Sequence, residues 1–333
     1  MSTPRTRAAL IPAVLAAAFL LAACTSGAGT PTTAPTGAAP GPTVSQVACA
    51  AAPEPSGIQT WTSAAENPNL VPVPVSGDLA CGDNRFLFSF IDRDNKPIAT
   101  PDRTVLVAFY DLAREAGVPT IQTTSRFIWG IEGVTGIYET DVTFPEAGIW
   151  GAEFATSVGG GPTTVVRMAF EVRKEGFAKR VGQAAPASKT PTAADFAGDI
   201  ARVSTDQHPE PAFYQLSVDQ ALAQHKPFLL AFATPKFCTS GQCGPTLDRI
   251  KPFLAKYPSV SFINVEPYAL EWKDGQLSAV ITNKALTPVQ ATLDYGLTTE
   301  PWVYVVDRTG VIRASFEGVF ADSELKAALD AVK

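Results

Sequence analysis

The chain has few of the residue types on which many binding and catalytic sites depend. Its 333 residues include only two histidines and two methionines, and 26 basic residues against 32 acidic ones give a net charge of −6. Lysine and arginine form no blocks, and aromatic residues do not alternate with basic ones. Such a charge pattern is unfavourable for binding nucleic acid or anionic lipid head groups. We therefore expect no nucleic-acid partner, and no motif indicates a cofactor.

The scarcity of histidine and methionine also limits metal binding in the first half of the chain. This part has no histidine, and its candidate ligands are Met168, Cys49 and Cys81, of which Met168 lies within a strand-like pattern typical of a core. Copper sites in proteins use histidine, methionine or cysteine ligands. We therefore expect no copper site in this part.

Long apolar runs are absent except at the N-terminus. Arg5 and Arg7 precede an uncharged stretch, residues 8–23, which is too short to span a bilayer and has the form of an export signal. The stretch ends in Leu21-Ala-Ala-Cys24, which resembles a bacterial lipobox. The resemblance implies that residues 1–23 are a lipoprotein signal peptide, that Cys24 is lipidated, and that the protein is anchored at the extracytoplasmic face of the cell membrane. An ordinary secretory signal is the alternative, and it also gives an extracytoplasmic protein.

Residues 24–69 follow as an expected flexible tether. The first part of this segment, up to about Thr60, is rich in Thr, Pro, Gly, Ala and Ser and carries a single charged residue, Glu54. Such a composition cannot bury enough apolar surface to offset the entropy of ordering. The tether would hold the folded part of the protein away from the membrane.

The five cysteines can be assigned by elimination to one lipidated residue and two pairs. If Cys24 carries the lipid, Cys49 and Cys81 form one possible pair, and Cys238 and Cys243 form another. An exported protein meets an oxidising compartment, where structural disulfides persist. We expect a structural disulfide between Cys49 and Cys81.

Residues 70–174 have the two-residue periodicity of β-strands, with turn signals between the runs. The expected strands are 85–92, 104–110, 136–143, 148–154 and 163–172. This pattern predicts an all-β sandwich. The stretch Phe144-Pro-Glu-Ala-Gly-Ile-Trp150 resembles the hairpin of immunoglobulin-like domains in bacterial exported proteins. A spacer or protein-binding role is the simplest interpretation. A second low-complexity stretch, residues 175–199, predicts an interdomain linker.

Residues 200–333 predict an α/β domain that contains the remaining cysteine pair. The expected strands are 227–233, 260–265, 302–306 and 311–316, and the expected helices are 217–224, 289–297, 322–332 and one that begins at Cys243. A thiol at the start of a helix meets unpaired N–H groups and the positive end of the helix dipole, which favour the reactive thiolate. The pattern indicates thiol–disulfide chemistry.

Two motifs of this region resemble the thioredoxin superfamily. Cys243-Gly-Pro-Thr246 is similar to its Cys-Gly-Pro-Cys active site, and Thr298 to Gly310 is similar to its cis-proline loop, strand and turn, with Pro301 as the proline. The resemblance implies a thioredoxin-like fold and a thiol–disulfide oxidoreductase acting on exported proteins or a redox partner. Cys243 would be the attacking thiolate, Cys238 would resolve the disulfide, and Pro301 would lie against the sulfur.

The chain departs from that family in two ways that keep other functions open. Thr246 replaces the second cysteine, and Ala231 stands where the family has a buried acid. A non-catalytic binding or scaffold lipoprotein with a structural disulfide in the loop is therefore the alternative. A copper-handling protein of the Sco type is a weaker alternative. The Sco family has three residues between its two cysteines and a histidine ligand after the loop, whereas this chain has four residues between Cys238 and Cys243, and both His208 and His225 precede the loop.

Overall fold

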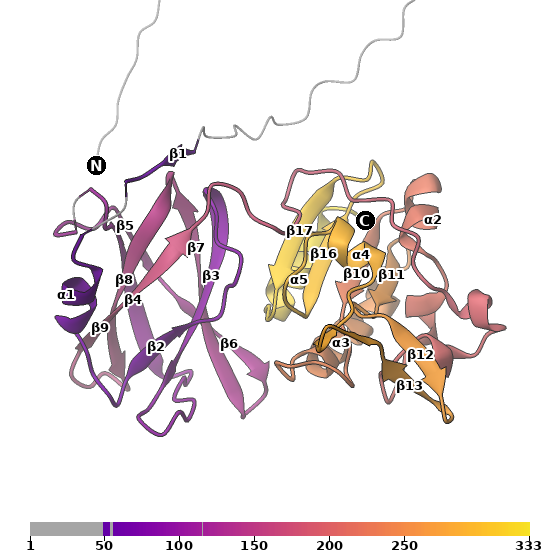
Figure 1. Ribbon diagram of the computed structural model, residues 1–333, viewed down its shortest axis with the longest axis horizontal. Helices are drawn as coiled ribbons and strands as arrows, with labels where there is room; N and C mark the ends of the chain where they lie inside the picture. The colour runs from indigo at the N-terminus through magenta and orange to yellow at the C-terminus, as the bar shows by residue number, and fades with distance from the viewer. Residues whose placement is uncertain (1–48, 54–55, 115) are drawn as a thin grey trace, which may run out of the picture. The chain divides into compact units, whose positions relative to one another are not determined.

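The computed structural model describes residues 49–53, 56–114 and 116–333. The expected signal peptide of residues 1–23, the lipidation site Cys24 and the first part of the expected tether lie outside the described residues. Within the described ranges, no helix has both the length and the apolar character needed to cross a bilayer. β-Strands dominate these residues and form several small sheets (Figure 1).

Two of these sheets lie in the first half of the described chain. One has the order β1-β8-β4-β5 with β9 also paired to β8, and its strands are β1 (Ala50–Ala51), β4 (Arg103–Asp111), β5 (Ile121–Thr124), β8 (Glu146–Val158) and β9 (Thr164–Val172). The other has the order β2-β3-β7-β6, and its strands are β2 (Val71–Pro74), β3 (Gly82–Ile91), β6 (Arg126–Ile131) and β7 (Thr135–Phe144). The five strands expected from the sequence correspond to β3, β4, β7, β8 and β9. β1, β2, β5 and β6 were not expected.

Alternating aromatic residues build the core between these two sheets. Phe86, Phe88 and Phe90 of β3 are fully buried and pack with Phe109 of β4 and Phe154 of β8. Successive side chains of a strand point to opposite faces, so the period of two places all three β3 phenylalanines on one face. Burying each such ring contributes about 2 kcal/mol. Leu87, on the opposite face of β3, belongs to a different cluster.

A helix occupies part of the segment predicted to be a tether. α1 (Ile58–Ser63) buries Trp61, whose indole N–H donates to the Ala116 carbonyl at 3.2 Å. The Trp61 ring packs edge-on against Tyr110, with ring centroids 5.4 Å apart, and Gly151 leaves it room because a Cβ there would lie 2.4 Å from the indole. The prediction of a flexible tether up to residue 69 is therefore wrong for this helix, because one buried tryptophan fixes it.

A mixed sheet with the order β11-β10-β16-β17 forms the centre of the second half. β10 (Phe228–Phe232) runs parallel to β11 (Ser261–Val265) and antiparallel to β16 (Trp302–Val306), which pairs with β17 (Ile312–Glu317). All four correspond to expected strands. The four helices around it are α2 (Val218–Ala223), α3 (Cys243–Ile250), α4 (Gln290–Asp294) and α5 (Asp322–Asp330).

Helices cover both faces of this sheet. Leu229 and Ala231 of β10 share a hydrophobic cluster with side chains of α3 and α5. Phe228, Leu230 and Phe232 share a second cluster with side chains of α2 and α4. β10 is therefore buried on both faces, which explains why its sequence is a continuous apolar run. Its carboxyl end leads directly into the cysteine loop (Figure 1).

Smaller elements complete this half. They are two hairpins, β12 (Leu270–Lys273) with β13 (Gln276–Ala279) and β14 (Ile281–Thr282) with β15 (Ala285–Leu286), and 3-10 helices at Ala193–Phe196, Ile200–Arg202, Pro211–Tyr214 and Lys251–Lys256.

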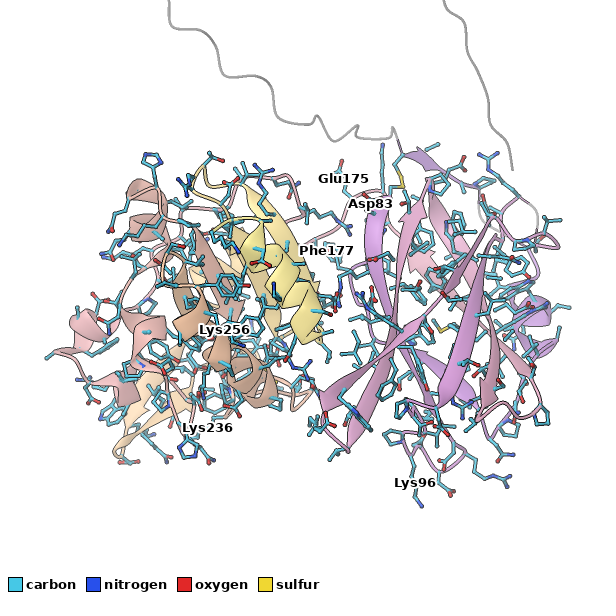
Figure 2. All side chains as sticks on the ribbon, turned by 180° about the vertical axis from the view of Figure 1, so that it is seen from behind. Asp83, Lys96, Glu175, Phe177, Lys236 and Lys256 are labelled. Atoms are coloured by element: carbon cyan, nitrogen blue, oxygen red, sulfur yellow. A yellow bond between two sulfur atoms is a disulfide. The ribbon has the colours of Figure 1, made fainter. Side chains whose placement is uncertain are left out.

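The predicted linker of residues 175–199 packs along the second half. After the exposed Phe177, labelled in Figure 2, Ala178 and Ala185 are buried in the cluster that contains α2 and α4. The Ala185 N–H donates to the Gly310 carbonyl at 2.8 Å, and Gly182 N–H donates to the carbonyl of the first residue of β17 at 2.9 Å. This segment is therefore packed against the second half, because its small side chains are buried and its backbone N–H groups donate hydrogen bonds to that half.

Candidate functional site

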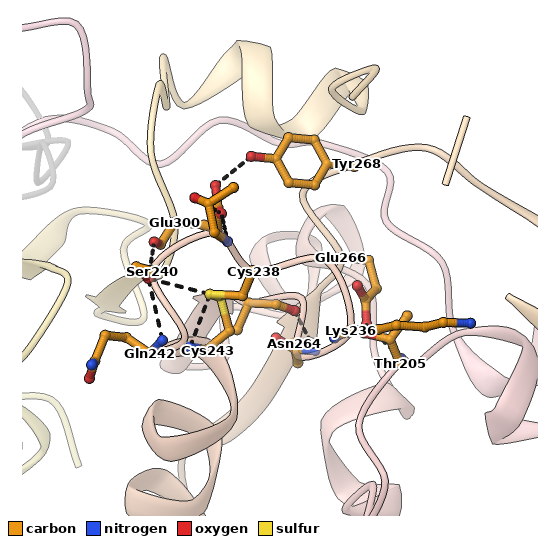
Figure 3. The surroundings of a disulfide bond; sticks show 12 residues. Thr205, Lys236, Cys238, Ser240, Gln242, Cys243, Asn264, Glu266, Tyr268 and Glu300 are labelled. Atoms are coloured by element: carbon orange, nitrogen blue, oxygen red, sulfur yellow. Dashed lines mark hydrogen bonds between the residues drawn. A yellow bond between two sulfur atoms is a disulfide. The ribbon is translucent and has the colours of Figure 1, made fainter. Parts of the chain in front are cut away.

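The loop between β10 and α3 contains a disulfide between Cys238 and Cys243, with the two Cα atoms 6.0 Å apart (Figure 3). α3 begins at Cys243, as the sequence predicted. Pro245 falls in its first turn, where a missing N–H removes no helical hydrogen bond. Leu247 and Ile250 bury the inner face of the helix. The fold thus holds one sulfur at the amino end of a helix and the other in the loop before it.

The two sulfur-bearing residues differ in exposure. Cys243 is fully buried at 0 % exposure, whereas Cys238 is only partly buried. The Cys243 N–H donates to Cys238 Sγ at 3.2 Å, and Ser240 Oγ lies 3.4 Å from the same sulfur. A partner can therefore approach the disulfide only at Cys238. The sequence led us to expect Cys243 to attack and Cys238 to resolve; the exposure of the two residues in the disulfide form favours the reverse assignment.

Glu300 connects the cysteine loop to the loop that contains Pro301. Its Oε1 accepts hydrogen bonds from the N–H and the hydroxyl of Thr239, both at 3.1 Å, and its carbonyl accepts one from Ser240 Oγ at 3.2 Å. The Glu300–Pro301 peptide bond is cis, and Pro301 is buried. The structure therefore brings the two sequence motifs together, and it does so through the side chain of Glu300, for which the sequence predicted no role.

Tyr268 completes this connection from another segment. Its hydroxyl donates to Glu300 Oε2 (Figure 3), and Glu300 itself is only 7 % exposed. Burial, together with the neighbouring Glu300 carboxylate, raises the pKa of Tyr268 above its usual value, so the phenol remains a donor. An acid immediately before the motif proline was the available signal for Glu300, whereas nothing in the sequence marks Tyr268 as its partner.

A second buried acid lies in the surroundings of the disulfide. Glu266 follows β11 directly and is 9 % exposed, and its Oε1 accepts hydrogen bonds from the N–H (2.6 Å) and the hydroxyl (2.8 Å) of Thr205. Burial raises the pKa of Glu266 to about 7 despite these bonds. Among the described residues, neither its Oε2 nor the hydroxyl of Thr234 has a hydrogen-bond partner, although the two groups are neighbours. Because β10 and β11 are parallel, Glu266 and the cysteine loop lie at the same edge of the sheet.

The two positions at which the chain departs from the resembled family are both buried. Ala231 is 1 % exposed within β10, and Thr246 lies in the first turns of α3 with its side chain covered. The Thr246 N–H donates to the Gln242 carbonyl at 2.8 Å. Neither position offers a thiol or a carboxyl group to the disulfide.

The other cysteines form the expected pair. Cys49 and Cys81 are joined by a disulfide with Cα atoms 6.0 Å apart and a sequence separation of 32. Cys49 immediately precedes β1 and Cys81 immediately precedes β3. The disulfide therefore fastens the first described residues to the sheet that contains β3.

Metal binding was one of the alternatives for the Cys238–Cys243 loop. Across residues 49–53, 56–114 and 116–333, no three His, Cys, Asp or Glu side chains gather closely enough to hold a metal ion.

Comparison of the chain with protein families, curated proteins and solved structures gave no match.

Proposed function

We propose that this chain is an extracytoplasmic thiol–disulfide exchange protein whose second half is thioredoxin-like and whose first half is an immunoglobulin-like sandwich. Attachment to the membrane through a lipid on Cys24 is part of the proposal. The observation that carries it is the asymmetry of the Cys238–Cys243 disulfide. One sulfur is partly exposed, and the other is buried at the first residue of a helix.

The exchange begins at the exposed sulfur. A thiolate of a protein substrate or redox partner attacks Cys238 Sγ and forms a mixed disulfide with it. The Cys238–Cys243 bond breaks, and its electron pair leaves with Cys243 Sγ. A thiol of low pKa is a good leaving group, and the amino end of α3 favours the thiolate that results. In the reverse direction, Cys238 attacks a substrate disulfide and Cys243 then resolves the mixed disulfide.

The loop around the disulfide supports this chemistry. The hydrogen bonds from Thr239 and Ser240 to Glu300 hold the loop beside the Pro301 segment and leave Cys238 partly exposed. The mixed sheet β11-β10-β16-β17, with helices on both faces and the cysteine loop at the carboxyl end of β10, supports the proposed thioredoxin-like second half.

The buried, uncharged Ala231 and the absence of a thiol at Thr246 favour a second function. In that case the disulfide would only brace the loop of a binding or scaffold protein. The two functions differ in one measurable quantity, which is the stability of the disulfide toward thiols.

The test is equilibration of the full chain in glutathione and dithiothreitol buffers. Exchange chemistry predicts a reduction potential above about −300 mV, whereas structural disulfides typically lie below that value. After reduction, Cys243→Ser should form a mixed disulfide with oxidised glutathione through Cys238. The matched variant Cys238→Ser should react at least tenfold more slowly through the buried Cys243. A pair that resists dithiothreitol would favour the scaffold function, and faster reaction of Cys243 would reverse the assigned roles.

A further inference from the structure

The helix that begins with Cys243 is held by strand β6 of the first half. The guanidinium of Arg249, in the last turn of α3, donates to the carbonyl of Trp129 at 2.7 Å and also to the carbonyl of Phe320. Its side chain is 20 % exposed. A guanidinium that bridges two carbonyls fixes both the position and the rotation of the helix end, because its donors are rigid and planar.

The other end of α3 meets the same strand. Gly130 follows Trp129 and lies against Gln242, the buried residue that precedes Cys243. A Cβ on Gly130 would lie 2.9 Å from Gln242 Oε1 and 3.3 Å from both Val319 Cγ2 and the Thr135 carbonyl oxygen. The missing side chain therefore allows the strand to approach the start of the helix.

Contacts on either side keep β6 in place. Leu87, Ile128 and Ile137 form one hydrophobic cluster with Val319, which precedes α5. Arg85 Nε and Arg126 Nη2 lie 2.9 Å and 2.8 Å from Glu324 Oε1 in the first turn of α5. The strand that touches α3 is thus part of an extended, well-packed contact and not a single hydrogen bond.

We propose that Arg249 and Gly130 are positioning residues for the redox pair. Together they hold α3 so that Cys243 stays within bonding distance of Cys238, which stabilises the disulfide form relative to the dithiol. This inference rests on the proposed function for its biological meaning, but it concerns the equilibrium of the pair itself. Linkage requires that contacts which favour the docked helix more in the oxidised form than in the reduced form also make the disulfide harder to reduce.

The test uses the full chain with Arg249→Met, which keeps an apolar stem and removes the donors, and separately with Gly130→Val. The measured quantity is the equilibrium constant for reduction of the Cys238–Cys243 disulfide in dithiothreitol buffers. Each variant should shift the constant three- to tenfold toward the dithiol, where tenfold corresponds to about 30 mV for a two-electron couple. Arg93→Met and Gly117→Val are matched controls, since Arg93 and Gly117 are exposed and a Cβ on Gly117 would meet open space. They should leave the constant unchanged.

A constant within twofold of the wild-type value in both variants, with native circular dichroism, would overturn the proposal. A shift toward the disulfide would overturn it as well. If the two variants do not fold, Arg249→Lys decides the question, because it keeps the charge but cannot bridge both carbonyls. It must then shift the constant by at least twofold in the same direction. A wild-type pair that resists dithiothreitol argues against the proposed function, whereas a reactive pair with unchanged constants in the variants argues only against this inference.

Discussion

The two disulfides of this protein have the same span and different surroundings. In both, the Cα atoms are 6.0 Å apart, but Cys49–Cys81 closes a sequence separation of 32 and Cys238–Cys243 one of 5. The only polar contact described at a sulfur of the first pair is that of Cys49 Sγ with the neighbouring Ala50 carbonyl. The second pair has a backbone N–H, a serine hydroxyl and the start of a helix beside its sulfurs.

This comparison separates stabilisation from reactivity. In the chain-entropy description, a cross-link stabilises the folded state more when it closes a longer loop. For loops of these lengths the contribution is about 4 kcal/mol for the first pair and about 2 kcal/mol for the second. The Cys238–Cys243 disulfide therefore contributes less to stability. It is also the pair with polar groups and a helix start beside its sulfurs, which can stabilise a thiolate when the bond breaks.

Removing each pair in turn gives the largest expected effects. Cys49→Ala/Cys81→Ala should lower the free energy of unfolding by about 4 kcal/mol and leave thiol exchange intact. Cys238→Ala/Cys243→Ala should lower it by about 2 kcal/mol and abolish exchange. Urea unfolding and turnover of a disulfide substrate measure the two quantities separately. The comparison would break down if the second pair contributed more stability than the first, or if loss of the first pair removed exchange.

A smaller effect concerns proton binding near the second pair. Burial raises the pKa of Glu266 to about 7, so the folded protein binds a proton there that the unfolded chain releases near pH 4.5. Stability from this group is therefore greatest at low pH and falls as the pH rises to about 7. Glu266→Gln should remove this pH dependence of stability, because an amide does not titrate. The substitution should be tolerated, since the amide nitrogen can face the Thr234 hydroxyl while the side-chain oxygen keeps the hydrogen bonds from Thr205.

The measurement is the unfolding free energy of wild type and Glu266→Gln at pH 5 and pH 8. Relative to wild type, the variant should gain about 2 kcal/mol between the two values. Glu139 also has a pKa raised by burial to about 7, but it is present in both proteins and cancels in this comparison. Glu271→Gln, on the exposed strand β12, is the control and should show no gain. An equal pH dependence in wild type and Glu266→Gln would mean that Glu266 titrates normally.

Much of the fold could be predicted from local patterns. The alternation of Phe86, Phe88 and Phe90 marks a strand with one buried face, and the apolar run of β10 marks a strand buried on both. The start of α3 at Cys243 follows from its apolar spacing. α1 could not be predicted, because it packs through Trp61 against Tyr110 and Gly151, which lie far along the chain.

The site could be predicted only in part, for a related reason. The cysteine pair and Pro301 are visible as motifs, but the exposure of each sulfur depends on how α3 packs into its cluster. Glu300 and Glu266 act through partners in distant segments, Tyr268 and Thr205, that no spacing rule connects. The contact of Trp129 with Arg249 joins residues 120 positions apart, so it depends entirely on tertiary structure.

The smallest expected effect concerns the hydrogen bonds between Thr239 and Glu300, which only the second of the two disulfide loops has among the described residues. Thr239 donates both its N–H and its hydroxyl to the Glu300 carboxylate, and nothing comparable is described beside Cys49. Glu300→Gln keeps the shape of the side chain but removes the charge, and it leaves one acceptor oxygen for Thr239 and an amide N–H facing the Tyr268 hydroxyl. Hydrogen bonds to a charged acceptor are stronger than neutral ones, so the loop should lose about 1 kcal/mol of local stability.

Amide hydrogen exchange at Thr239 reports that loss directly. A change of about 1 kcal/mol corresponds to roughly fivefold faster exchange, confined to the cysteine loop. Exchange in β3, next to Cys81, should be unchanged. The exposed Glu132→Gln serves as control, because it removes a charge without touching either loop. If Thr239 exchanged at the wild-type rate in Glu300→Gln, the backbone alone would hold the loop, and the two disulfides would differ only in their closure lengths and in the helix that begins at Cys243.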